Sequence, residues 1–330
     1  METAVSPASP GILSVVKPDK LLHDLSDIWL SMAKPDSESG SGVLRACSMT
    51  LVVIVDDEDD AMDLGETLSL LMREHPSRAI VIRLCEGSGQ LEGRVFAQCW
   101  KPFGHGQQIC CEQVELKASL NRLADVPSIV SPLTVPDLPS VVWFRSSRIA
   151  SAPDISGLLA LGNKLIVDSS RPGSPSFADI RTLAGAGFVV GDLAWTRLTA
   201  LRQLVAQLLE GKDLTSIRTV VIEHCGHDAG AEAKYLQAWL RSSLLSATVD
   251  FLRADTDGDG TIRKLHIDAD INIVVGASCA DYESGTLHQR ANLSSGSEHA
   301  LLDEELGIMK RDAVFERALQ RMTIWKPRAY

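Results

Sequence analysis

The chain has 330 residues and a formal net charge of −11, and 45% of its residues are hydrophobic. This length exceeds the usual size of a single core, so we expect two domains. The acidic balance argues against a general nucleic-acid binder and against docking on an anionic membrane, because both need a basic face. It permits a protein partner or a small ligand.

The sequence also bears on the compartment. Residues 1–10 lack the basic and apolar regions of a signal peptide, and no apolar run approaches the about 20 residues that cross a bilayer. The seven cysteines form no C-x-x-C pair, and their odd number argues against a secreted disulfide framework. We therefore expect a cytoplasmic protein in which each cysteine is buried as a small apolar side chain, with Cys110 and Cys111 on opposite faces of a strand.

The first half of the chain begins with a predicted tail, a short amphipathic helix over 21–33 and a flexible linker. A strand over 49–55, a helix over 61–74 and a strand over 78–84 then form a βαβ unit, which implies parallel strands. The remaining segments are strands over 94–99 and 108–116 around a Gly-rich turn at 103–106, a short helix over 120–126, and loop-bounded core segments over 129–133 and 140–144.

Strand and helix patterns alternate again in the second half. They predict helices over 155–161, 176–184, 193–209 and 231–244, and strands over 164–167 and 219–222. The pattern then changes, and strands over 248–254 and 261–275 are predicted to pair as an antiparallel hairpin. Polar residues 281–299 predict a loop, and 301–322 predict one final amphipathic helix.

These elements predict an α/β protein with two Rossmann-like lobes and mixed sheets, the second lobe carrying the antiparallel hairpin and the C-terminal helix. The expected division is an N-terminal tail, helix and linker over 1–42, an α/β domain over 43–150, and a second α/β domain over 151–330.

Three motifs have the composition of metal ligands. The acidic run at 56–60 is typical of a helix N-terminus, where carboxylates complement the dipole. Residues 255–260 (DTDGDG) match half of a calcium loop, but His266 stands where a bidentate Glu belongs and the flanks read as strands, which favours a turn. His224 and His227 with Cys225 could ligate zinc, but no second ligand pair lies nearby, so a strand-end turn is favoured and we expect no metal.

The loop 168–174 follows a predicted strand and precedes a helix. In open α/β sheets, ligands bind at the carboxyl ends of strands. Near Asp168, the hydroxyls of Ser169 and Ser170, the guanidinium of Arg171 and backbone N–H groups could cradle a phosphate. Ser and Gly are also ordinary loop residues, so both interpretations stay open.

The common catalytic motifs are absent from the sequence. No G-x-G-x-x-G opens the first βα unit, and neither a P-loop nor a G-x-S-x-G nucleophile elbow occurs. Nicotinamide, ATP and hydrolase assignments therefore lack their physical basis. We expect a protein that is not an enzyme and that needs no cofactor.

The stretch 191–199 (GDLAWTRLT) is distinctive. Asp192 is a plausible cap before a helix, and Trp195 and Arg197 project from its first turns. Trp and Arg together are favoured in protein–protein contacts, although a core Trp beside a solvated Arg is equally compatible.

This stretch resembles the signature D-L-x-W-x-R-L-T-P-W-R of the OpcA family, the glucose-6-phosphate dehydrogenase assembly proteins. The matching residues are Asp192, Leu193, Trp195, Arg197, Leu198 and Thr199, whereas Ala200 and Leu201 replace Pro-Trp before Arg202. Three further stretches match in the same order: 73–78 resembles the H-P-x-R turn, 136–145 the D-x-P-x-x-x-W-W segment with Phe144 for the second Trp, and 166–170 the V-D-S stretch. Together the matches span roughly residues 43–210.

The resemblance implies a non-catalytic partner that assembles and activates glucose-6-phosphate dehydrogenase at the entry to the oxidative pentose phosphate pathway. It leads us to expect that Trp143, Arg145, Trp195 and Arg197 lie near one functional surface. Two alternatives remain: a sugar-phosphate-binding enzyme or ligand sensor that uses the loop 168–174, and a divergent structural paralogue with another partner.

Overall fold

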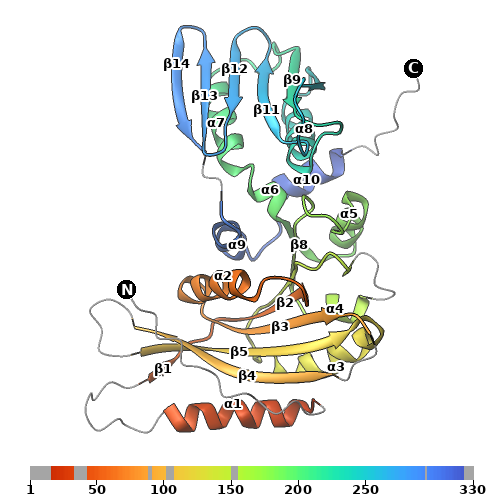
Figure 1. Cartoon of the computed structure of the whole chain (residues 1–330). Helices are drawn as coiled ribbons and strands as arrows, with labels where there is room; N and C mark the ends of the chain where they lie inside the picture. The colour runs from red at the N-terminus through yellow and green to blue at the C-terminus, as the bar shows by residue number, and fades with distance from the viewer. Residues whose placement is uncertain are drawn as a thin grey trace. The chain divides into compact units, whose positions relative to one another are not determined.

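The computed structural model describes residues 16–32, 43–87, 91–101, 108–149, 155–293 and 296–322 (Figure 1). The predicted N-terminal tail up to residue 15, the predicted linker over 34–42 and the Gly-rich turn at 103–106 lie outside these residues. The chain forms two compact units: Met1–Val167 with Arg171–Ser174, and Asp168–Ser170 with Pro175–Tyr330. No helix in the described ranges is both long and apolar enough to span a bilayer.

The predicted βαβ unit is the centre of the first unit. Strands β2 (Met49–Asp56) and β3 (Ser77–Cys85) are parallel neighbours, and helix α2 (Ala61–Glu74) connects them. Every residue of β2 is buried, as expected for a parallel strand covered on both faces. Helix α2 contributes the buried stripe Leu64, Leu68, Leu71 and Met72, which follows helical spacing.

The other strands extend this sheet on both sides. The strand order runs β1-β5-β3-β2-β6-β7, and β4 pairs with β5. The bounds are β1 (Val43–Arg45), β4 (Glu92–Trp100), β5 (Gln108–Ser119), β6 (Ser140–Phe144) and β7 (Lys164–Val167). The chain therefore moves outward from β2 to β3 and then returns to β6 on the other side of β2. This reversal makes the carboxyl ends of β2 and β6 a topological switch point.

Further helices complete the first unit. Helix α1 (Pro18–Met32) contacts β4, buries Leu21 and Leu25, and donates from Trp29 Nε1 to Glu112 Oε1 at 2.5 Å (Figure 1). The short helix predicted over 120–126 is a 3₁₀ helix over Leu120–Asp125. The core segment predicted over 129–133 is helical too, since it lies in α3 (Val126–Val130) and a 3₁₀ turn over Ser131–Leu133. Helix α4 (Ser156–Leu159) follows.

The expectation that every cysteine is a free, buried side chain is wrong for most of them, because Cys47, Cys85 and Cys279 are only partly buried and two others form a disulfide. Cys99 and Cys110 are disulfide-bonded across the antiparallel pair β4–β5, where they stand directly opposite with Cα atoms 4.0 Å apart. The register of the two strands brings the cysteines together, and sequence spacing alone does not reveal that register. Cys111 is a free thiol packed against Met72 and Ala79.

The second unit is a mixed sheet with helices. Its early elements are α5 (Phe177–Gly185), β8 (Val189–Asp192), α6 (Leu193–Thr196) and α7 (Thr199–Leu209). The sheet then has the order β10-β9-β11-β12-β13-β14, and α8 (Ala231–Ser243) connects β9 (Thr219–His224) to β10 (Thr248–Arg253).

The predicted hairpin between 248–254 and 261–275 is wrong. Strand β10 pairs in parallel with β9, and β11 (Ile262–Ile267) lies antiparallel on the other side of β9. The loop between β10 and β11 crosses the end of β9, where Gly226 N donates to Thr256 O at 3.0 Å. Gly226 has φ +76°, and a Cβ there would overlap Gly258 O, so glycine permits this crossing. The hairpin that does form joins β11 to β12 (Ile271–Val275).

The loop predicted over 281–299 contains two strands. These are β13 (Cys279–Ser284) and β14 (Leu287–Asn292), paired in antiparallel fashion. Most residues of β14 are exposed, and Arg290 forms an ion pair with Asp281 across the two strands. A polar edge strand lacks the apolar alternation that identifies a half-buried strand, which explains the error.

Two predicted helices are each divided in two. The final helix separates into α9 (Glu298–Leu306) and α10 (Ala313–Arg321), because Asp312 caps α10 by accepting from Val314 N and Phe315 N. The helix predicted over 193–209 breaks between α6 and α7. There Leu198 N bonds to Trp195 O in a tightened turn, and Thr196 Oγ1 donates to Asp192 O. Apolar spacing runs through both breaks, so periodicity does not reveal them.

Candidate functional site

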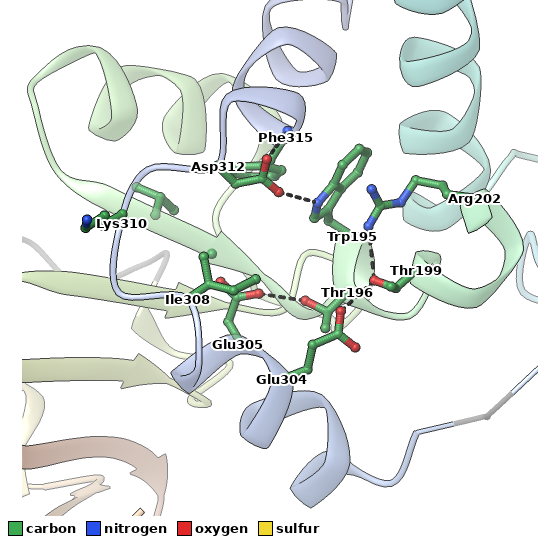
Figure 2. Close-up of a pocket in the computed structure, with 12 residues that line it drawn as sticks. Trp195, Thr196, Thr199, Arg202, Glu304, Glu305, Ile308, Lys310, Asp312 and Phe315 are labelled. Atoms are coloured by element: carbon green, nitrogen blue, oxygen red, sulfur yellow. Dashed lines mark hydrogen bonds between the residues drawn. The ribbon is translucent and has the colours of Figure 1, made fainter. Parts of the chain in front are cut away.

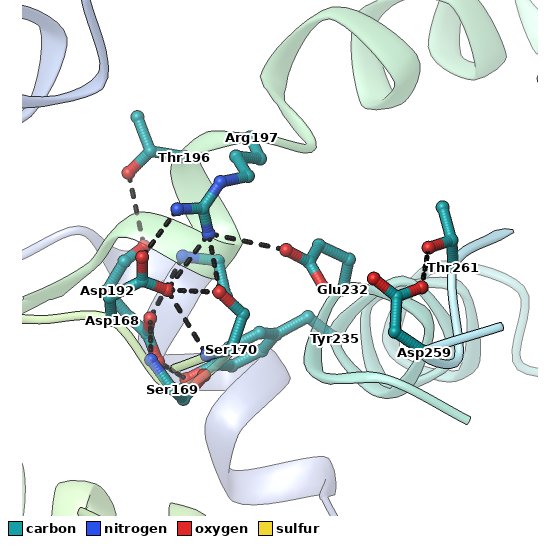
Figure 3. Close-up of polar contacts among 11 residues, drawn as sticks. Asp168, Ser169, Ser170, Asp192, Thr196, Arg197, Glu232, Tyr235, Asp259 and Thr261 are labelled. Atoms are coloured by element: carbon teal, nitrogen blue, oxygen red, sulfur yellow. Dashed lines mark hydrogen bonds and ion pairs between the residues drawn. The ribbon is translucent and has the colours of Figure 1, made fainter. Parts of the chain in front are cut away.

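Asp192 is the centre of a buried hydrogen-bond network in the second unit (Figure 3). It ends β8 and caps α6, as predicted, by accepting from Ala194 N at 3.0 Å. The same oxygen, Oδ1, accepts from Ser169 N at 3.0 Å, and Oδ2 accepts from Tyr235 Oη at 2.7 Å. Asp192 is fully buried and no cation contacts it directly among the described residues, so its partners are neutral donors.

Asp168 forms a second, charged cluster beside it. Arg197 binds both oxygens of Asp168, with 2.9 Å between Nη1 and Oδ1. The same Nη1 lies 3.3 Å from Glu232 Oε1 and 2.9 Å from Ser170 Oγ. Figure 3 shows the Arg197 guanidinium above this group of oxygens. The Asp168 side chain is 3% exposed and that of Arg197 30%, so the ion pair is largely shielded from water.

The pKa values of the two aspartates are shifted in opposite directions. Burial raises the pKa of Asp192 to about 6, although its hydrogen-bond donors act to lower that pKa. Burial would also raise the pKa of Asp168, but the hydrogen bonds and positive charge of Arg197 outweigh it and hold that pKa below its ordinary value. The pKa of Tyr235 lies well above its ordinary value because of burial and the charge of Asp192.

Donors of the loop 168–174, which was proposed as a phosphate cradle, already bind Asp168 and Asp192 in the structure. Ser170 directs both its backbone N and its hydroxyl to Asp168 Oδ1, at 3.2 and 2.6 Å, and Ser169 N is bound to Asp192. A phosphate would compete with buried carboxylates for the same donors. The structure thus brings Asp168, Ser169, Ser170, Asp192 and Arg197 together, whereas Arg171 belongs to the first unit.

Trp195, in α6, lines a pocket of the second unit (Figure 2). Its ring packs against Tyr235 and Phe315, with centroids 5.8 and 5.7 Å apart, and its Nε1 donates to Asp312 Oδ2 at 3.3 Å. Only 4% of Trp195 is exposed. In the isolated chain it is therefore a core residue.

Trp143 and Arg145 belong to the first unit. Trp143, in β6, is 1% exposed. Arg145 follows the same strand and pairs with Asp59 Oδ2 at 3.0 Å and Asp63 Oδ2 at 2.6 Å. A surface shared by these two residues with Trp195 and Arg197 stays a prediction.

The switch point of the first unit is likewise filled by an aspartate. Asp56 ends β2 and accepts from Ser146 Oγ, from Ser147 N at 2.9 Å and from Ser147 Oγ at 2.6 Å. Burial acts to raise its pKa, but the serine donors and the charge of Arg148 outweigh burial and lower it. The acidic run at 56–60 predicts only a helix N-terminus for Asp56. Its position as the last residue of a buried strand, which Asp168 nearly repeats after β7, is the signal that could have identified it.

The metal motifs bring no ligand set together. Within the ranges that the structure describes, no group of three or more His, Cys, Asp and Glu side chains could hold an ion. His224 is buried with its ring 5.7 Å from that of Phe251, and Asp259 accepts from Thr261 Oγ1.

The fold and these sites describe an α/β protein of two units. The donors described above at the ends of its strands bind the chain's own carboxylates, Asp56, Asp168 and Asp192. Two family models match the sequence. One is described as the N-terminal domain of a glucose-6-phosphate dehydrogenase subunit and covers residues 69–184; the other is the C-terminal domain of the same subunit and covers residues 189–319. The chain therefore belongs to the OpcA family, which confirms the resemblance and extends it to residue 319.

Relatives carrying the name OpcA, of the OxPP cycle, are similar over part of the chain. The protein from Synechococcus elongatus is 28% identical over 193 residues, which are 54% of this chain and 42% of that protein. The protein from Nostoc punctiforme is 26% identical over 163 residues, 48% of this chain and 35% of that protein. The chain thus matches less than half the length of these relatives.

Solved structures with a similar fold include the 3-ketoreductase KijD10 from Actinomadura kijaniata. It has 9% sequence identity and a TM-score of 0.46, and the likeness covers 86% of this chain and 96% of that one. It concerns the α/β architecture alone.

Proposed function

We propose that this chain is a non-catalytic assembly protein and allosteric activator of glucose-6-phosphate dehydrogenase, acting in the cytoplasm within the oxidative pentose phosphate pathway. The observation that carries the proposal is membership of the OpcA family over both units. The strand ends support it, because most hydrogen-bond donors at Asp56, Asp168 and Asp192 bind these carboxylates, the hydroxyl of Ser169 excepted. A protein of this kind acts by stabilising one conformation of its partner and needs no nucleophile.

The test is the activity of the dehydrogenase from the same organism, with and without this chain. Nicotinamide reduction is followed across glucose-6-phosphate concentration, and complex formation is followed by co-elution. We expect a lower half-saturation or a higher maximal rate, together with a complex. An unrelated acidic protein of similar net charge is the control, since charge alone must not reproduce the effect.

The absence of both a complex and a rate change would reject the proposal and leave family membership as common ancestry. The isolated chain would then be titrated with a phosphorylated sugar, which separates the ligand-sensor alternative from a paralogue with a different partner.

A further inference from the structure

The sheet of the second unit, which contains β9 to β14 (Figure 1), has one apolar and one polar face. Ile222, Leu265 and Ile273 lie on the apolar face and are completely buried. Successive side chains of a strand point to opposite faces, so the residues that alternate with these three form the polar face. Most of the polar face lines an open groove with a volume of about 640 Å³.

Charged residues of the polar face alternate in sign across the sheet. One row, taken from β9, β11, β12, β13 and β14 in that order, consists of Glu223, Lys264, Val274, Asp281 and Arg290. Lys264 Nζ lies 3.3 Å from Glu223 Oε2, and Arg290 Nε lies 2.7 Å from Asp281 Oδ1. Two ion pairs thus flank an uncharged centre, and their charges sum to zero in a chain whose net charge is −11.

This order of charges is self-complementary. When the polar faces of two copies meet about a two-fold axis parallel to β12, β11 lies opposite β13 of the second copy and β9 lies opposite β14. Lys264 then faces Asp281, Glu223 faces Arg290, and Val274 meets its own equivalent. Each ion pair meets the other pair with its charges reversed, so four alternating charges form a network on either side of the axis. Sheets that pack face to face keep their strands within about 30° of each other, which lets the rows meet.

The next row along the strands follows the same rule. His266 of β11 and Glu283 of β13 both pair in register with Asn272 of β12, and His266 Nδ1 lies 2.5 Å from Asn272 Oδ1. The same axis places His266 opposite Glu283 of the second copy. The centre of the face, Asn272 and Val274, is uncharged, and the charges lie to its sides. Protein interfaces have this arrangement, because charged residues are depleted from their centres.

We propose that the polar face is the interface of a homodimer, in which a second copy of the chain packs about the axis along β12. The inference goes beyond the proposed function, since it concerns self-association and not the dehydrogenase. Charge complementarity identifies the occupant. A partner must present the same charge order in reverse across five strands, and a second copy of the chain does so.

The size of the face sets the expected affinity. Six strands about 4.8 Å apart and about 18 Å long give each copy a projected area of about 500 Å². The two copies together then bury about 1,000 Å², which is the lower limit of specific interfaces. We therefore expect a weak dimer with a dissociation constant of about 10 μM.

The test is sedimentation equilibrium of the full-length chain without the dehydrogenase. K264E places two carboxylates opposite each other and D281K two ammonium groups, so we expect each variant alone to dimerise about 100-fold more weakly than the wild type. An equimolar mixture of K264E and D281K should associate again. In the mixed dimer the carboxylate introduced by K264E faces the ammonium introduced by D281K, and the other contact is the wild-type pair.

K212E is the matched control. Lys212 is 38% exposed and pairs with Asp270, as Lys264 is 43% exposed and pairs with Glu223, but Lys212 lies outside the polar face. We expect K212E to dimerise as the wild type does. V274D is a second arm in case D281K does not fold, because it places two carboxylates at the axis and should also weaken the dimer. Thermal unfolding shows which variants fold.

A wild type that stays monomeric up to about 1 mM overturns the inference. If K264E then weakens binding of the dehydrogenase, the polar face belongs to that partner instead. Equal dimerisation of folded K264E, V274D and K212E, or a mixture of folded K264E and D281K that does not associate, also overturns it. The dehydrogenase assay tests the proposed function separately, so either idea can fail without the other.

Discussion

The Asp168 and Asp192 clusters of the second unit each contain a buried carboxylate that accepts a hydrogen bond from one of two adjacent serines. The two carboxylates differ in the partners that stabilise their negative charge. Asp168 binds a guanidinium through both oxygens and stays ionised. Asp192 is more deeply buried and has only neutral donors as direct partners, so its pKa rises to about 6. The comparison shows that hydrogen bonds from Ser169, Ala194 and Tyr235 do not replace a positive charge when the carboxylate is taken completely out of water.

The largest expected effect comes from removing the cation. Arg197→Met would leave Asp168 buried without its charged partner, and we expect a loss of about 3 kcal/mol in the free energy of unfolding. Arg290→Met is the matched control and should leave stability almost unchanged, because its ion pair with Asp281 is exposed. Urea unfolding at pH 7.5 measures both, and equal effects of the two variants would contradict the proposed difference in burial.

The next effect depends on pH. The folded-state pKa of Asp192, about 6, exceeds its unfolded value of about 3.9, so the folded state stays protonated up to a higher pH than the unfolded state. Its contribution to stability is therefore greatest at acidic pH and decreases as pH rises from about 4 to about 6. Asp168 has the opposite sign, because its lowered pKa stabilises the fold above the unfolded value and that stabilisation is lost in acid.

Asp192→Asn isolates the first of these contributions. An amide oxygen still accepts from Ser169 N and Ala194 N, but it carries no charge. Relative to the wild type, we expect this variant to gain about 2 kcal/mol of stability between pH 4.5 and pH 7.5. A constant stability difference across that range would show that Asp192 does not titrate there.

Tyr235→Phe should produce a smaller loss. It removes the donor to Asp192 Oδ2, and we expect a loss of about 1.5 kcal/mol at pH 7.5, where Asp192 is ionised. The midpoint of the pH-dependent window should also move upward, because the ionised carboxylate loses a partner. Unfolding curves at several pH values measure both quantities, and an unchanged midpoint would argue against this hydrogen bond.

The smallest effect is expected at Ser170. Ser170→Ala removes one donor to Asp168, but Arg197 still binds both oxygens. Because Ser170 is exposed and water can replace its hydroxyl, we expect a loss of about 0.5 kcal/mol. A loss as large as that of Arg197→Met would mean that the serine, and not the guanidinium, keeps Asp168 ionised.

Much of the architecture could be predicted from the residues alone. The continuous apolar run of β2 and the helical spacing of α2 depend on local periodicity, and both elements were predicted within a residue of their observed bounds. The strand-end position of Asp168 and the capping role of Asp192 also follow from local order. The phosphate cradle predicted for the loop after β7 stays a prediction, and in the structure Ser170 of this loop donates to Asp168.

Other features depended on which segments meet in space. The parallel pairing of β10 with β9, the polar strands β13 and β14, and the disulfide between Cys99 and Cys110 all require a register that the sequence does not state. Tyr235 contacts Asp192 with no sequence signal beyond its place on a helix, whereas Arg202 belongs to the family signature, which does not reveal that it stacks on Trp195. Tertiary structure decided their roles and the opposite pKa shifts of Asp168 and Asp192. Desolvation and charge compensation depend on everything packed around a group and not on its neighbours along the chain.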